Sequence, residues 1–160
     1  GDTEGRVRAT AAWALGSIGD ARAIPGLVEA SVDRESNVRK SVAQALGMLG
    51  VGDKDVIEIL LGLLRDEHPA VRLSAAEAFG DLGKEAESAV PRLIRALDDR
   101  DENVHKMIKK SLVRIGDVAV PFLSRALREG RFYIRDSSAE ILTEIGTPAA
   151  IEALKSVKEN

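Results

Sequence analysis

Residues 7–20 read VRATAAWALGSIGD, and related strings recur along the chain of 160 residues. The copies are VRKSVAQALGMLG (38–50), VRLSAAEAFGDLG (71–83), VHKMIKKSLVRIG (104–116) and IRDSSAEILTEIG (134–146). Each begins with a β-branched residue and reaches a glycine twelve residues later. Apolar residues recur within each copy at helical spacing, and glycine after such a run is a typical helix stop signal. The string therefore predicts one helix per copy.

A second helix is predicted after each glycine. In residues 90–97 the apolar residues Val90, Leu93, Ile94 and Leu97 follow helical spacing. The interval between the glycine and the start of this helix varies along the chain, whereas the two segments that carry the predicted helices keep the same length in each copy. Because loops absorb changes in length and packed helices do not, each unit is interpreted as helix–turn–helix.

A single helix pair cannot bury both of its apolar faces, so the pairs are expected to stack. We predict an all-α fold, a right-handed α–α superhelix (solenoid) of five two-helix repeats. The repeats are expected at about 2–33, 34–66, 67–99, 100–129 and 130–160, within one domain covering 1–160. The chain starts at Gly1 instead of Met, which suggests a fragment of a larger protein.

The pattern V-R-x-x-A-A-x-A-L-G-x-[IL]-G-D resembles the HEAT-like repeats named after phycobilisome lyases. The first copy carries it nearly intact, from Val7 and Arg8 to Gly19 and Asp20. The fourth copy departs most, with His105 in place of the arginine and Val113 in place of a glycine. The resemblance implies a solenoid but says little about function, because this repeat serves many unrelated proteins.

An acidic residue stands six positions before the second residue of each copy. In HEAT-like proteins such residues form a ladder of ion pairs and hydrogen bonds between neighbouring repeats. Helix ends need hydrogen-bonding partners, and arginine with a carboxylate supplies several charge-assisted bonds. The resemblance therefore assigns a structural role, instead of a catalytic one, to Asp33, Arg39, Asp66, Arg72, Asp99, His105, Glu129 and Arg135, with Asp2 and Arg8 preceding them.

Catalytic and metal-binding signals are sparse. The chain has no cysteine, so a disulfide framework and a thiolate metal site are excluded. Its histidines, His68 and His105, lack metal-ligand spacing and the His-Glu pairing of iron-dependent HEAT-like enzymes. Neither a phosphate-binding glycine loop nor a Ser-His-Asp set is apparent. We predict a cytoplasmic protein that is not an enzyme, with no metal, no cofactor, no membrane contact and no small-molecule ligand.

The second helices of this family usually line the concave face of the solenoid. Residues on that side that the core does not require are candidates for recognition, and arginine and aromatic side chains are favoured at interfaces. Alternatively, Phe122 fills a gap between helices and the arginines form a solvated face. The predicted partner-binding residues are Ile59, Arg92, Arg95, Phe122, Arg125 and Arg128.

Charge is unevenly distributed. Residues 104–135 hold eight Lys/Arg and two acidic residues, a net +6 within a chain of net charge −3. Such a band attracts acidic partners. We therefore predict a non-enzymatic protein–protein interaction scaffold whose partner carries an acidic segment. A bilin lyase-like or maturation factor subunit is the alternative implied by the resemblance. Nucleic-acid binding through the fourth repeat is weaker, because a duplex needs basic contacts along the whole arc.

Overall fold

A computed structural model of the chain describes residues 3–50 and 52–158, which form ten α-helices and three short 3-10 helices. Asp2, the first acid of the predicted ladder, lies outside the described residues. The α-helices are α1 (Thr3–Ile18), α2 (Ile24–Ala30), α3 (Ser36–Leu49), α4 (Lys54–Leu63), α5 (Pro69–Leu82), α6 (Val90–Ala96), α7 (Glu102–Ile115), α8 (Val120–Glu129), α9 (Phe132–Ile145) and α10 (Pro148–Lys158). The 3-10 helices are η1 (Ala21–Ala23), η2 (Gly83–Ala89) and η3 (Gly116–Ala119).

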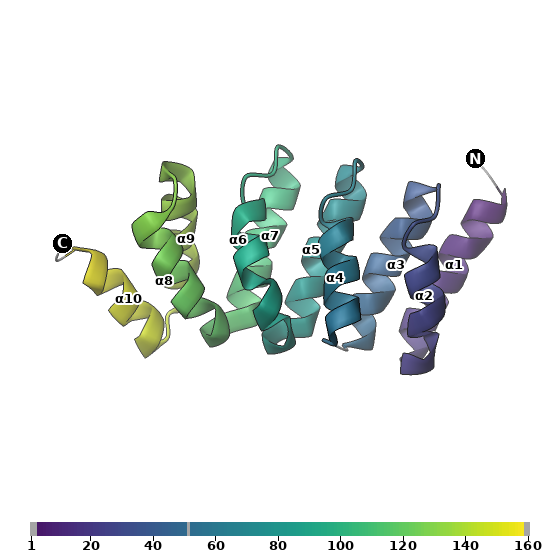
Figure 1. Cartoon of the computed structure of the whole chain (residues 1–160), viewed down its shortest axis with the longest axis horizontal. Coiled ribbons are helices and arrows are strands. Elements are labelled where there is room, and N and C mark those ends of the chain that lie inside the picture. The colour runs from purple at the N-terminus through teal and green to yellow at the C-terminus, as the bar shows by residue number, and fades with distance from the viewer. Residues whose placement is uncertain (1–2, 51, 159–160) are drawn as a thin grey trace.

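The helices stand side by side in two layers, with the two ends of the chain at opposite ends of the row (Figure 1). Helices α1, α3, α5 and α7 form one layer, and α2, α4, α6 and α8 form the other. Each second helix packs on the first helix of the next pair, as α2 does on α3 and α4 on α5. This arrangement confirms the predicted all-α solenoid. None of the described helices is long and apolar enough to cross a membrane.

The first helices end at the glycines that the sequence pattern marks. Gly19, Gly50, Gly83, Gly116 and Gly146 all have positive φ, between 55° and 76°. A side chain at such a φ costs free energy that glycine avoids, so the chain can reverse there. Proline then stands in the first turn of α2, α6 and α8, where the missing N–H has no partner to lose.

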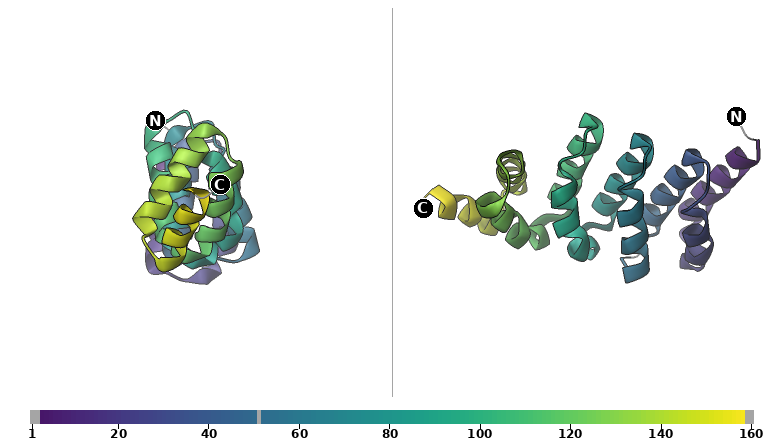
Figure 2. Two further views of the ribbon diagram at one scale, coloured as in Figure 1. Left: turned by 90° about the vertical axis from the view of Figure 1, so that its left-hand side faces the viewer. Right: turned by 45° about the horizontal axis from the view of Figure 1, so that its top comes forward.

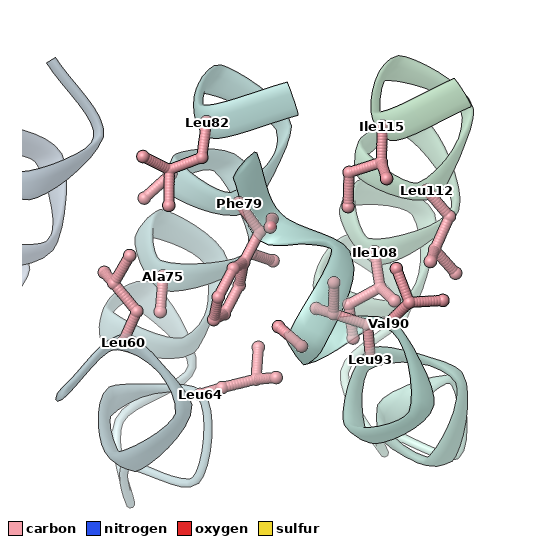
Figure 3. Close-up of a cluster of buried hydrophobic side chains, with 14 of the residues drawn as sticks. Leu60, Leu64, Ala75, Phe79, Leu82, Val90, Leu93, Ile108, Leu112 and Ile115 are labelled. Atoms are coloured by element: carbon pink, nitrogen blue, oxygen red, sulfur yellow. The ribbon is translucent and has the colours of Figure 1, made fainter. Parts of the chain in front are cut away.

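The core runs through the whole row of helices. At its centre, Phe79 of α5 is fully buried, and Figure 3 shows it in a cluster that also includes Leu60, Leu64, Leu93 and Ile108. These side chains come from four successive helices and the turn after α4. Because the apolar side chains of each helix pair pack against those of the next pair, the apolar surface of one pair is covered only when its neighbour is folded beside it.

Neighbouring first helices approach closely through glycine. A Cβ added at Gly16 of α1 would lie 2.5 Å from the Cα of Ala45 in α3, and one at Gly47 would lie 2.9 Å from the Cα of Ala78 in α5. Gly80 faces Ser111 of α7 in the same way. Any side chain at these glycines would push the two helices apart, so the close spacing depends on glycine facing a small residue.

The regular row changes between α7 and α9. Val113 of α7 stands where α1, α3 and α5 carry glycine, and Ile141 of α9 stands where α3 and α5 carry alanine. The connection from α8 to α9 has two residues, 130–131, whereas the three earlier connections have five. Helix α9 packs mainly on α8 and is turned out of the row, so that Figure 2 (right) shows it nearly end-on.

Candidate partner-binding groove

Three arginines of the predicted ladder connect successive helix pairs. The Nε atom of Arg39 donates to Asp66 Oδ2 at 2.6 Å, and that of Arg72 donates to Asp99 Oδ2 at 2.7 Å. Arg8 donates to Asp33 in the same way at 2.7 Å. Each arginine thus reaches a carboxylate in the turn that leads from its own helix pair to the next one, 25 or 27 residues further on.

The guanidinium groups of Arg39 and Arg72 also hold the turn that precedes their own helix. Arg72 Nη1 donates to the carbonyl oxygen of Asp66 at 2.9 Å, so one side chain links two consecutive turns. Burial raises the pKa of the Asp99 carboxyl, but hydrogen bonds from Arg72 and from the N–H of Asp101 outweigh it and hold this pKa below its usual value. The pKa values of Asp33 and Asp66 are lowered by their arginines in the same way, so these three carboxyls are held as anions.

The ladder stops at the fourth helix pair, so assigning Glu129 and Arg135 to it was wrong. Glu129 accepts a hydrogen bond from Arg125 Nε at 2.8 Å on its own helix, and Arg135 is exposed. His105 Nδ1 lies 2.7 Å from the carbonyl oxygen of Leu97 in the preceding turn. Imidazole is too short to span both turns, and α8 continues through Glu129, which leaves no five-residue turn to present a carboxylate.

A groove of about 680 Å³ opens where the ladder stops, between α6, α8 and α9. Ile94 and Ile134 are buried on its floor, and the half-buried Phe122 and Ala126 lie beside them. Gly130 forms one edge, where an added Cβ would collide with the carbonyl oxygen of Ala126. The charged residues around the groove are Arg95, Asp98, Arg125, Glu129 and Arg131.

The structure brings three of the six predicted binding residues together, since Arg95, Phe122 and Arg125 all line the groove. Arg92 lies in the adjacent hollows with Arg95 and donates to Glu58 Oε1 at 2.6 Å. The other two lie apart from the groove. Ile59 is half-buried against the core, and Arg128 donates to Ser124 Oγ at 2.8 Å.

Sequence reasoning missed the contribution of α9. Tyr133 and Ile134 line the groove, and the exposed Phe132 precedes them. The hydrogen bond between Tyr133 and Asp98 raises the pKa of the phenol, and burial adds to this shift. Asp98, in the turn after α6, thus lies close to Tyr133 at the start of α9. The aromatic pair Phe132-Tyr133 is the signal that could have been found, because no other first helix of the row has aromatic residues in its first turn.

Arg95 differs electrostatically from Arg92 and Arg125, the other predicted basic residues beside the groove. It lines the groove and both neighbouring hollows, and it makes no ion pair or hydrogen bond within residues 3–50 and 52–158. Arg92 is held by Glu58, and Arg125 is held by Glu129. Arg95 therefore offers its guanidinium to a ligand with no internal ion pair to break.

Much of the basic band 104–135 is neutralised within the structure. Lys106 pairs with Glu102 and Lys109 pairs with Glu140. Arg114 donates to Asp81 Oδ1 at 2.6 Å across to α5. In the part of the chain that the structure describes, no three His, Asp or Glu side chains are grouped so as to hold a metal ion.

The fold and its arginine-linked turns define a helical-repeat protein, and the comparison with family models agrees. The model for HEAT repeats matches residues 1–80, 32–108 and 60–142, so the chain belongs to the HEAT repeat family. The model for the PBS lyase HEAT-like repeat matches residues 134–160. No protein with a curated description matches the chain.

Solved structures show the same solenoid. An engineered protein is 23% identical with a TM-score of 0.61, and the match covers 99% of this chain and 81% of that one. A second is the complex of CpcE and CpcF of phycocyanin lyase from Nostoc sp. PCC7120, at 28% identity and a TM-score of 0.56. That match covers 91% of this chain and 58% of the Nostoc chain, so this chain spans little more than half of its length.

Proposed function

We propose that this chain is a non-enzymatic scaffold that binds a protein partner on the face of its second helices, at the groove between α6, α8 and α9. The observation that carries the proposal is the position of Arg95, a guanidinium that has no partner among the described residues and lies beside an apolar floor. Interface hot spots commonly combine arginine or aromatic side chains with a site that excludes water. Ile94, Phe122 and Ile134 supply that apolar surface here.

The partner segment is expected to be acidic with at least one apolar side chain. A carboxylate can form two parallel hydrogen bonds with the guanidinium of Arg95, which adds geometric specificity to charge attraction. Asp98 and Glu129 also border the groove, so a long run of acidic residues would meet repulsion. A single carboxylate next to an apolar anchor fits the distribution of charge better than a polyanion does.

Nucleic acid fits this surface less well. Phosphate binding depends on several cationic contacts along the backbone. Lys106, Lys109 and Arg114 are already paired with carboxylates, and none of them lines the groove. A gel-shift assay with duplex DNA tests this alternative. Salt-dependent binding of DNA that displaces acidic peptides from the protein would contradict the protein-partner proposal.

The proposal is tested by the binding of fluorescent peptides that combine one acidic residue with apolar residues at varied spacing. Arg95→Glu should weaken the best binder at least tenfold, about 1.4 kcal/mol, because attraction becomes repulsion. The melting temperature should stay unchanged, since Arg95 is exposed and forms no ion pair with any residue that the structure describes.

Lys110→Glu is the matched control, because Lys110 is exposed on α7, outside the groove, and the substitution changes charge by the same amount. If Arg95→Glu and Lys110→Glu weaken peptide binding equally, the affinity depends only on the net charge of the protein and not on the groove. Unchanged binding by Arg95→Glu would show that the groove is not the binding site.

A lyase-like subunit is the second candidate function, favoured by the likeness to the complex of CpcE and CpcF of phycocyanin lyase. In that case Arg95 and Arg125 would pair with the propionates of a bilin. Mixing the protein with a free bilin should then shift the visible absorbance, and Arg95→Glu should abolish the shift. A spectrum equal to the sum of the separate components would contradict this candidate.

A further inference from the structure

A smaller hollow of about 300 Å³, which we call the α4–α6 hollow, lies next to the groove. Its buried side is apolar and consists of Leu61 and Leu64. Two exposed arginines also line it, Arg65 in the turn after α4 and Arg95 on α6. The α4–α6 hollow and the groove share Arg95 and Asp98, so one bound segment can occupy both.

The α4–α6 hollow has an excess of positive charge. Arg72 and Arg92, which also line it, are each paired with a carboxylate, at 2.7 and 2.6 Å. Arg65 and Arg95 form no ion pair or side-chain hydrogen bond with any residue in 3–50 and 52–158. Asp98 adds one negative charge against these two cations. The hollow is therefore a place where an anion meets two available guanidinium groups.

Between α2 and α8, two arginines meet in this way at one step of the row. Arg65 stands near the end of one helix pair, and Arg95 stands in the second helix of the next pair. The residues equivalent by sequence position at the neighbouring steps are Val32 with Gly62 and Asp98 with Arg125. The first step is thus uncharged and the second combines opposite charges. A solvated basic face would extend along the row, whereas a cationic pair at one step favours a local anion.

Two guanidinium groups at one hollow match a phosphate better than a carboxylate. A carboxylate has two oxygens, and a single guanidinium can bind both through parallel hydrogen bonds. A phosphorylated side chain carries a charge of about −1.5 to −2 at pH 7 and has three acceptor oxygens. It can therefore accept hydrogen bonds from Arg65 and Arg95 together, whereas a carboxylate at this point is satisfied by Arg95 alone.

We propose that the partner segment carries a phosphorylated side chain, which Arg65 and Arg95 bind in the α4–α6 hollow, and that an apolar side chain of the same segment enters the groove. This inference rests on the function proposed for the groove, because both places bind one segment. Packed helices lie about 8–10 Å apart, and an extended segment covers about 3.3 Å per residue. The phosphorylated residue should therefore lie about three residues from the apolar one.

Fluorescent peptides with one leucine test the ligand chemistry. Serine, glutamate or phosphoserine is placed roughly two to four residues from the leucine, on either side, and fluorescence anisotropy measures each Kd. We expect the best phosphoserine peptide to bind about tenfold more tightly than its glutamate counterpart, because it engages the second arginine. Equal affinities would overturn the inference, and so would a complete lack of binding by the phosphoserine peptides.

Arg65→Gln tests the second arginine. It should weaken the phosphoserine peptide about tenfold and leave the glutamate peptide and the melting temperature nearly unchanged, since Arg65 is exposed. Arg128→Gln is the matched control, because Arg128 is exposed on α8 and lines neither the hollow nor the groove. The control should bind both peptides as the wild type does.

The two variants separate this inference from the function proposed for the groove. Equal weakening of the phosphoserine and glutamate peptides by Arg65→Gln would overturn the phosphate assignment and leave the groove in place. Equal weakening of the phosphoserine peptide by Arg65→Gln and Arg128→Gln would do the same, since net charge would then explain the loss. A glutamate peptide that binds Arg95→Glu as well as the wild type would refute the groove itself, and this inference with it.

Discussion

Replacing Arg72 by methionine should destabilise the solenoid more than the same change at Arg8. Both arginines donate two hydrogen bonds to an aspartate in the turn that follows their own helix pair. They differ in burial, because the side chain of Arg72 is 7% exposed and that of Arg8 is 37% exposed. Methionine keeps most of the apolar stem, so the comparison isolates the charge and its hydrogen bonds.

The size of the effect follows from what each substitution leaves behind. Arg72→Met leaves the Asp99 carboxylate, which is 11% exposed, without its ion-pair partner, and it removes the hydrogen-bond donor to the carbonyl oxygen of Asp66. Removing one partner of a buried ion pair costs about 3–5 kcal/mol. Arg8→Met removes a pair that water can partly replace, so about 1 kcal/mol is expected.

Urea unfolding followed by circular dichroism measures both free energies of unfolding. Arg72→Met should also lower the melting temperature by roughly 6–20 °C, given about 2–4 °C per kcal/mol for a chain of this size. Equal losses for the two variants would refute the reasoning that burial sets the strength of the ladder. A loss below about 1 kcal/mol for Arg72→Met would show that the ladder contributes no more than a surface pair.

Three further predictions concern the packing and the charges. Gly47→Ala should cost about 1–3 kcal/mol of unfolding free energy, because the new Cβ would lie 2.9 Å from the Cα of Ala78. Gly26 has open space around it, so Gly26→Ala should instead stabilise α2 by about 0.5 kcal/mol. Phe79→Ala should cost about 3–5 kcal/mol, since the ring is fully buried, and a smaller loss in urea unfolding would mean that neighbouring helices collapse into the space. The pKa of Asp99 is lower in the folded chain, so the unfolded chain takes up the proton first and wild-type stability falls as pH drops below about 4. Arg72→Met lacks this loss, so the difference between the two unfolding free energies should narrow from pH 4 to pH 2, and a constant difference would contradict the assignment.

The regular part of the fold could be predicted because local signals agree with the packing. Glycine at the end of each first helix, proline in the first turn of α2, α6 and α8, and an apolar stripe between them all act within a few residues. The same regularity marked Arg39 and Arg72 as structural. It did not reveal that each arginine reaches the carboxylate in the turn after its own helix pair, because spacing in sequence does not state which neighbouring turn a long side chain contacts.

The groove was harder to predict, because it depends on interactions between separate helices. Sequence reasoning placed Arg95, Phe122 and Arg125 on one face, but it assumed that every repeat continues the same superhelix. Val113 and Ile141 prevent α7 and α9 from packing as the earlier pairs do, and the residues of α9 enter the groove as a result. The large side chains of Val113 and Ile141 are visible in the sequence. The direction in which α9 turns away depends on all the side chains between α7, α8 and α9, which the sequence alone does not position.

The interruption after α7 gives the molecule a mechanically weak joint. From α1 to α7 each step is held by an arginine bridge and by glycine against a small residue, whereas the step to α9 has neither. If the two ends of the chain are pulled apart, the segment α8–α10 should separate first, at lower force than the remaining helices. A ligand that spans α6 and α9 would act as a clamp across that joint. Single-molecule stretching would then register its binding as a higher rupture force.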